Sequence, residues 1–241
     1  MPLIKLDATD STNDYLKQLN KTSALENYTI VMANEQTGGK GQMGAKWISE
    51  KGKNLTMSVL VYDPFLTIDR KFDLNIAVAL SAIKVLKNLY IPKVSIKWPN
   101  DIMAGSKKVA GILIENSLKA DGSFTAVVGI GLNLNQTNFG ELQQAISLTS
   151  ITQDIYDLQD IALSLRESLK KSVLELSQNA DLLWNEYHEN LYKINYPSAF
   201  EDKLGNRFMG IIRKVTRDGM LEISLQDDST SRFAVKEIRM L

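Results

Sequence analysis

Three lysines stand in short segments whose neighbouring residues suit the binding of an anion. Lys40 lies in TGGKGQMGAKW (residues 37–47), where four glycines fall within seven positions. Lys97 opens the segment KWPND, and Lys108 precedes a run of small and apolar residues in KKVAGILIE. Glycine leaves backbone N–H groups uncovered, and such groups together with ammonium side chains bind anions. The three segments therefore predict a site for a phosphate or an acyl-adenylate.

The glycine-rich segment has other interpretations. Gly39, Gly41 and Gly44 match the dinucleotide fingerprint as a string, but that fingerprint needs a helix after the third glycine. The residues that follow, AKWISEKGKN, have no helical pattern, and the P-loop spacing of glycine, lysine and Ser/Thr is also absent. A flexible surface hairpin is the remaining alternative. Lys40, together with the aromatic plane of Trp47, which suits a nucleotide base, favours a binding loop over it.

The elements that must position these segments indicate an α+β body with antiparallel strands. Strands are expected at 28–36, 55–62 and 94–98, and helices at 72–89 and 157–177, with a further helix through Tyr187. A short strand, a polar turn and a helix are expected at the N-terminus. Two long strands within 107–135 are expected to form a hairpin across Asp121-Gly122.

The sequence changes in character after about residue 193. Short alternating segments are separated by turns at Asp218-Gly219 and Asp227-Asp228. They predict a small β module, which at this size needs to dock on its neighbour for stability. We therefore expect a domain at 1–192 and a second domain at 193–241.

Composition narrows the function classes. The chain has 241 residues, 28 Lys and Arg against 28 Asp and Glu, and no cysteine. The balanced charge disfavours a nucleic-acid partner, and the lack of cysteine excludes disulfides, thiolate zinc sites and cysteine nucleophiles. The sequence has neither a signal peptide nor an apolar run of membrane-spanning length. A soluble, cytoplasmic protein with no membrane partner is expected.

Five motifs occur in the order and spacing of the biotin–protein ligases. They are DSTN (10–13), EQTGGKGQMGAKW (35–47), KWPND (97–101), KKVAGILIE (107–115) and GIGLNLN (129–135). The resemblance covers about residues 1–140. It implies a mixed sheet flanked by helices, related to class II aminoacyl-tRNA synthetases, followed by a small SH3-like β-barrel. The chain begins almost at the first motif, so it resembles the monofunctional type without an N-terminal DNA-binding domain.

The family resemblance implies a two-step reaction that uses ATP, biotin and Mg²⁺. The carboxylate of biotin attacks the α-phosphate of ATP to give biotinyl-5′-AMP and pyrophosphate. A lysine of a biotin carboxyl carrier protein, or of the carrier domain of a carboxylase, then takes the biotinyl group. The first step brings two anions together, so cations are needed there, and Lys40, Lys97 and Lys108 are the catalytic candidates. Whether the chain forms a homodimer stays open.

The resemblance also implies a role for particular residues. Biotin would be bound by Ser11, Thr12, Asn13, Gln36, Lys40, Gly41, Gln42, Lys108 and Gly111. ATP and the adenylate would be bound by Gly39, Lys40, Gly41, Trp47, Lys97, Asn100 and Asn133. Asp101 is the candidate metal ligand. The single histidine, His188, is expected to be a surface or packing residue.

One departure from the family pattern concerns the glycine-rich loop. The commoner loop carries arginines where this chain has Lys40, Gln42 and Ala45. Because arginine's planar fork binds phosphate at two points and lysine does not, we expect weaker retention of the adenylate.

Two alternative functions share features with the ligase. A lipoate–protein ligase shares the fold and the adenylate chemistry, but its loop usually carries Arg-Arg and a Gly-Gly-Gly followed by His-Asp, which are absent here. A non-catalytic biotin sensor acting through the C-terminal β module would bind ligand without releasing pyrophosphate. The lysines and the KWPND segment disfavour that second alternative.

Overall fold

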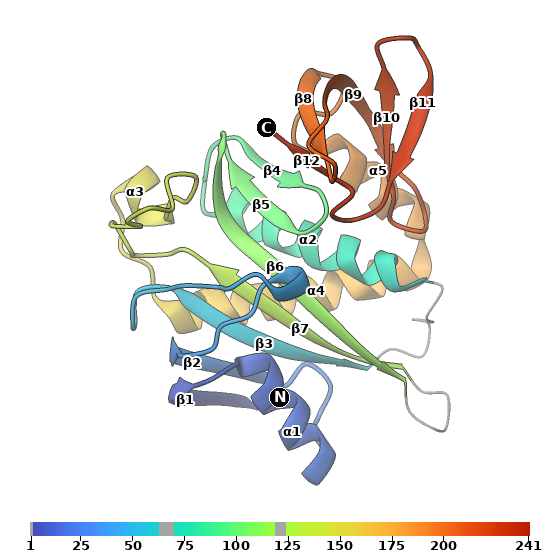
Figure 1. Ribbon diagram of the computed structural model, residues 1–241. Coiled ribbons are helices and arrows are strands. Elements are labelled where there is room, and N and C mark those ends of the chain that lie inside the picture. The colour runs from blue at the N-terminus through green and yellow to red at the C-terminus, as the bar shows by residue number, and fades with distance from the viewer. Residues whose placement is uncertain (1, 63–69, 119–123) are drawn as a thin grey trace.

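A mixed seven-stranded sheet forms the body of the protein (Figure 1). The computed structural model describes residues 2–62, 70–118 and 124–241. The sheet order is β1-β2-β3-β7-β6-β5-β4, with β1 parallel to β2 and every other neighbouring pair antiparallel. Its strands are β1 (Leu3–Thr9), β2 (Ile30–Gln36), β3 (Leu55–Tyr62), β4 (Val94–Lys97), β5 (Asp101–Ala104), β6 (Lys107–Leu118) and β7 (Phe124–Leu132). The expected mixed sheet is confirmed. The Asp121-Gly122 turn lies outside the described residues.

Alternating residues of strand β3 lie on opposite faces of this sheet. Leu55, Met57, Val59 and Val61 pack into the large core formed with helices α2 (Lys71–Asn88) and α4 (Leu158–Gln178). Leu60 points to the opposite face and packs with Leu16 of α1 (Thr12–Thr22). Alternation at period two therefore places the apolar residues under α2 and α4, and Thr56 and Ser58 on the other face. The same face carries the polar site described below.

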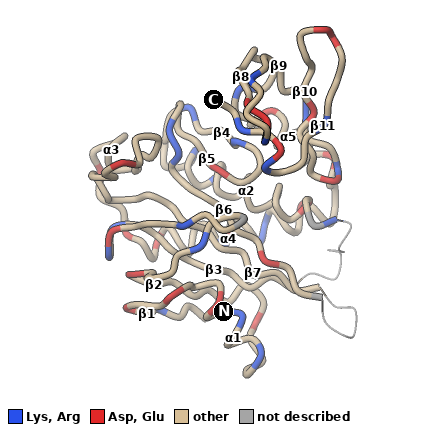
Figure 2. Tube along the Cα trace, viewed as in Figure 1, with Lys and Arg blue, Asp and Glu red and all other residues tan. Residues whose placement is uncertain are grey.

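Three further helical segments complete the body. They are α3 (Leu148–Thr152), α5 (Ala180–Glu189) and the 3₁₀ turn η1 (Gln42–Gly44). The helix expected at 157–177 is α4, and its buried residues include Ile161, Leu165 and Leu169. None of the helices in the described part of the chain is long and apolar enough to cross a bilayer. Figure 2 shows basic and acidic positions interspersed along the trace.

A separate five-stranded antiparallel sheet closes the chain, as expected from the change in sequence character. Its order is β11-β10-β9-β8-β12. The strands are β8 (Pro197–Asp202), β9 (Arg207–Val215), β10 (Leu221–Leu225), β11 (Thr230–Phe233) and β12 (Ile238–Met240). The two shortest strands, β11 and β12, lie at opposite edges and do not pair with each other. The sheet is therefore open, and closure into a barrel is not confirmed.

The C-terminal sheet docks on the body through aromatic side chains. The indole of Trp98 donates a hydrogen bond to the carbonyl of Gly219 at 3.0 Å, and the Arg217 guanidinium lies 4.6 Å from the centre of the Trp184 ring on α5. His188 on α5 contacts the backbone of Val215 through Nε2 at 2.9 Å. His188 is thus a packing residue at the junction, as expected.

Replacing Gly219 by alanine is expected to loosen this junction. Gly219 has φ +89°, and an added Cβ would lie 2.5 Å from the Phe72 ring, so the variant suffers both backbone strain and a clash. We expect a loss of about 1–3 kcal/mol in the free energy of unfolding, measured by thermal or urea denaturation. Gly205→Ala is the matched control, because Gly205 has φ +86° with open space around it. Equal losses of unfolding free energy in the two variants would show that the clash with Phe72 contributes nothing.

Candidate active site

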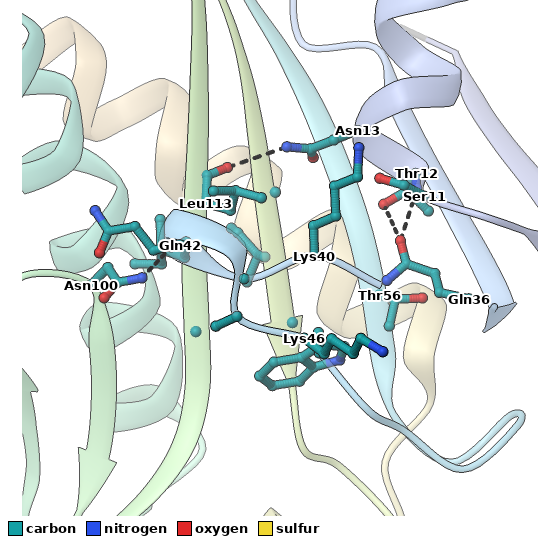
Figure 3. Close-up of a pocket in the computed structure, with 18 of the residues that line it drawn as sticks. Ser11, Thr12, Asn13, Gln36, Lys40, Gln42, Lys46, Thr56, Asn100 and Leu113 are labelled. Atoms are coloured by element: carbon teal, nitrogen blue, oxygen red, sulfur yellow. Dashed lines mark hydrogen bonds between the residues drawn. The ribbon is translucent and has the colours of Figure 1, made fainter. Parts of the chain in front are cut away.

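A cavity of about 240 Å³ lies on the sheet face that α2 and α4 leave open (Figure 3). Its floor is formed by strand residues with small side chains, including Gly111, Gly129 and Gly131. Its walls are the start of α1, the end of β2 and the loop at 37–47. The predicted site residues in its lining are Ser11, Thr12, Asn13, Gln36, Lys40, Gly41, Gln42, Trp47, Asn100, Asp101, Lys108 and Gly111.

Three predicted residues border neighbouring cavities instead. Asn133 lines a cavity of about 410 Å³, which shares Trp47 and Lys108 with the first. Gly39 lines a cavity formed by the glycine-rich loop itself. Lys97 borders a cavity of about 220 Å³ between the body and the C-terminal sheet. The main cavity and the Asn133 cavity therefore meet at Lys108, and Lys97 stands to one side of them.

The start of α1 presents a cluster of buried polar groups to the main cavity. Ser11 caps the helix, and its hydroxyl oxygen accepts from the Asp14 N–H at 3.3 Å. The Thr12 N–H and hydroxyl both donate to Gln36 Oε1, at 2.8 and 3.0 Å. Ser11, Thr12 and Asn13 are each at least 96% buried, so unpaired polar atoms here would be costly. Figure 3 shows Ser11, Thr12 and Gln36 together at one end of the cavity.

Two residues for which the sequence predicts no role complete this cluster. The hydroxyl of Ser58 lies 2.6 Å from Asn13 Oδ1 and 2.7 Å from Thr12 Oγ1. Glu115 accepts from Asn13 Nδ2 at 2.8 Å and pairs with Lys17, also at 2.8 Å. A signal was present for Ser58, because the alternation in 55–62 places it on the face opposite the apolar core. Glu115 ends the KKVAGILIE motif, but nothing in that motif indicates what it contacts.

The glycine-rich loop folds over the strands of the floor. Trp47 donates its backbone N–H to Gly39 at 2.9 Å, and Lys40 and Lys46 form an isolated β-bridge. The Trp47 indole lies on Gly111 of β6 and Gly131 of β7, which are paired across the two strands. A Cβ added to Gly131 would come within 2.4 Å of the ring. Glycine at 131 thus lets the indole approach the sheet closely.

Two lysines that line the main cavity, Lys40 and Lys108, are paired with carboxylates. Lys108 Nζ lies 2.5 Å from Asp101 Oδ1 and 5.9 Å from the centre of the Trp47 ring. Lys40 pairs with Asp14, and hydrogen bonds from Lys17 and Lys40 lower the pKa of the Asp14 carboxyl. Burial lowers the pKa of Lys97, and the nearby Asp101 partly opposes that shift. Asp101 is thus a carboxylate that pairs with Lys108 and lies opposite Lys97 in the β4–β5 register.

The fit of a magnesium ion depends on Asp101. Among the residues described as lining the main cavity, it is the one carboxylate. The described part of the chain has no group of three Asp, Glu, His or Cys side chains that could hold a metal. Mg²⁺ commonly binds through one or two carboxylates together with substrate phosphates. A single carboxylate fits an ion that phosphate groups also hold, and Asp101 is the side chain that would bind such an ion.

The part of the chain that forms most of this cavity matches a known protein family. Residues 6–135 match the biotin/lipoate A/B protein ligase family. The chain belongs to this family. The bifunctional ligase/repressor BirA of Bacillus subtilis is 31% identical over 238 residues, covering 93% of this chain and 73% of that protein. The biotin–[acetyl-CoA-carboxylase] ligase of Paracoccus denitrificans is 35% identical over 131 residues, covering 54% of this chain and 53% of that protein.

Solved structures of biotin protein ligases share the fold along the whole chain. The Aquifex aeolicus enzyme in complex with biotin and ATP superposes with a TM-score of 0.81 at 24% identity, covering 100% of this chain and 98% of that one. The Leishmania major enzyme in complex with biotinyl-5-AMP gives a TM-score of 0.65 at 22% identity, with 97% and 99% covered. The family fold thus includes the C-terminal sheet as well as the matched domain.

Proposed function

We propose that this protein is an ATP-dependent biotin–protein ligase. It converts biotin to biotinyl-5′-AMP and transfers the biotinyl group to a lysine of a biotin carboxyl carrier protein or domain. The observation that carries the proposal is the hydrogen-bonding pattern of the polar cluster at the start of α1. The related proteins named as biotin ligases support the same assignment.

The internal hydrogen bonds of the cluster decide which groups remain for a ligand. Gln36 Oε1 already accepts two hydrogen bonds from Thr12, so the Gln36 amide N–H groups remain as donors. Ser11 Oγ accepts from a backbone N–H, which leaves its O–H as a donor. Thr12 Oγ1 and Asn13 Oδ1 each keep an acceptor lone pair. The cluster therefore offers two side chains as donors and two as acceptors, which complements a cyclic urea with one carbonyl and two N–H groups.

This pattern distinguishes biotin from lipoate. The head of biotin is a cyclic urea, whereas the dithiolane ring of lipoate has neither a carbonyl nor an N–H. Lipoate would leave the Ser11 O–H and the Gln36 N–H donors without partners, at about 1–3 kcal/mol for each group. Sites built to hydrogen-bond a substrate reject analogues that lack those groups far more strongly than they discriminate by shape.

The activation step fits the junction of the two cavities at Lys108. With the urea at α1, the biotin tail runs over the glycine floor toward Lys108, and the nucleotide occupies the cavity lined by Trp47 and Asn133. A carboxylate oxygen of biotin attacks the α-phosphorus, and the bond from that phosphorus to the pyrophosphate oxygen breaks. Two unit charges about 4 Å apart repel by about 4 kcal/mol at an effective dielectric constant of 20. The Lys108 ammonium offsets that repulsion, and Mg²⁺ held with Asp101 would neutralise phosphate charge.

The transfer step completes the cycle. The uncharged amine of the carrier lysine attacks the acyl carbon, AMP leaves, and the amine gives up a proton. The loop at 37–47 shields the mixed anhydride from water until the carrier arrives. We assign residues 1–192 to this chemistry, and residues 193–241 to an SH3-like module beside it.

The exchange of pyrophosphate into ATP tests this function against its nearest rival. Purified protein with Mg²⁺, ATP and labelled pyrophosphate should exchange label when biotin is added. Lipoate should support exchange with a kcat/KM at least about 10²-fold lower, because its ring leaves polar groups unpaired. Exchange driven by lipoate and not by biotin would identify a lipoate ligase instead. Binding of biotin without exchange would identify a sensor.

A further inference from the structure

We propose that Glu115 is a positioning residue that sets the specificity of the site for a cyclic urea. It does so by fixing which end of the Asn13 amide faces the ligand. This inference rests on the proposed function and adds a residue to which neither the family motif nor the comparisons assign a role. It depends on the contacts around one side chain at the start of α1.

The space around Asn13 does not decide its orientation. The amide packs on the backbone of Gly129, where an added Cβ would lie 2.5 Å from Asn13 Oδ1 and 3.2 Å from Nδ2. A rotation of 180° about the last side-chain bond exchanges oxygen and nitrogen without changing the volume of the group. The choice between the two orientations is therefore made by hydrogen-bond partners.

The partners differ in how they respond to such a rotation. The Ser58 hydroxyl, 2.6 Å from Oδ1, can donate or accept, so it tolerates either end of the amide. The Leu113 carbonyl accepts from Nδ2 at 3.5 Å, which is a weak contact. The Glu115 carboxylate, at 2.8 Å from Nδ2, can only accept. If Asn13 rotated, its oxygen would face that carboxylate and two acceptors would be in contact.

Glu115 is itself held in place. Its second oxygen pairs with Lys17 Nζ at 2.8 Å, and Lys17 also contacts Asp14 at 2.7 Å. The carboxylate is thereby fixed beside the cavity without lining it. Its effect on a ligand passes through Asn13, whose oxygen is kept toward the cavity as an acceptor for a urea N–H.

The test is a comparison of biotin affinities by calorimetry in purified variants. Glu115→Ala should weaken biotin binding by about tenfold, because the amide is free to present N–H groups to the N–H of the ligand. ATP affinity should stay unchanged. Lys17→Met is the matched control. It removes the ion pair and keeps the hydrogen bond from Asn13, so biotin affinity should stay within about threefold of the parent value.

Exchanging the amide at position 13 with the carboxylate at position 115 distinguishes an effect of amide orientation from a general loss of structure. Asn13→Asp alone places two carboxylates in contact and should weaken biotin binding by about tenfold or more. Adding Glu115→Gln supplies an amide that donates to one oxygen of the introduced carboxylate and leaves its other oxygen toward the ligand. The double variant should therefore bind biotin more tightly than Asn13→Asp.

The outcomes are distinguishable from failure of the proposed function. If the parent protein does not bind biotin, the proposed function fails. If the parent protein binds biotin and Glu115→Ala binds it equally well, the positioning role alone is overturned. A double variant no better than Asn13→Asp, with both folded by thermal denaturation, also overturns it.

Discussion

Replacing Lys108 by alanine is expected to lower the rate of biotinyl-adenylate formation by about 10²- to 10³-fold. Lys108 borders both the cavity assigned to biotin and the cavity assigned to the nucleotide. The variant loses the cation at the point where the carboxylate and the α-phosphate must meet. Biotin-dependent exchange of pyrophosphate into ATP measures the effect directly. Because the charge matters most in the transition state, kcat should fall more than KM rises.

Lys107 provides a matched control for this substitution. It precedes Lys108 on β6, is exposed, and lines none of the cavities described above. Lys107→Ala removes the same charge from the opposite face of the strand and should leave the exchange rate unchanged. Equal rates for Lys108→Ala and the parent protein would refute the role of Lys108. Equal losses of exchange rate in the two variants would show that the effect comes from the net charge of the protein and not from the position of Lys108.

Replacing Gly131 by alanine is expected to lower adenylate formation by at least about tenfold. The added methyl group would lie 2.4 Å from the Trp47 ring, closer than two carbon atoms can approach, so the indole must move. Trp47 lines both cavities and lies beside the Lys108 ammonium. Its displacement disturbs the floor on which biotin and nucleotide meet. Exchange kinetics and tryptophan fluorescence should change together.

A double-mutant cycle tests the mechanism behind this effect. If the loss arises from displacement of the indole, then Gly131→Ala should have little further effect in a Trp47→Ala background. Fully additive losses would show that the methyl group acts on something other than Trp47. A Gly131→Ala variant with the exchange rate and fluorescence of the parent protein would contradict the close contact between the Trp47 indole and Gly131.

The sequence predicted most of the fold because local patterns in it are strong. The alternation of Leu55, Met57, Val59 and Val61 with polar residues gave both the strand and its buried face. Apolar residues at helical spacing gave α4 in the same way. The sequence does not predict the short strand β5, since four residues after a proline turn carry no periodic signal. Closure of the C-terminal sheet was expected from the resemblance, and the sheet is open.

The site was predicted less evenly than the fold. Motifs brought Ser11, Gln36 and Lys108 into one cavity, because each motif ends or begins an element at the same face of the sheet. The placement of Lys97 depends on the pairing of β4 with β5 and on the docked C-terminal sheet, which no local pattern specifies. Contacts such as Glu115 with Asn13 join residues 102 positions apart and exist only in the folded chain.

Intact-mass spectrometry of a carrier domain tests the central claim most directly. The domain should be incubated with this protein, MgATP and an equimolar mixture of biotin and lipoate. A cyclic-urea site predicts that the carrier gains one biotinyl group, that no lipoyl adduct forms, and that omission of ATP abolishes the change. A carrier that stays unmodified, or that gains the lipoyl group, would contradict it.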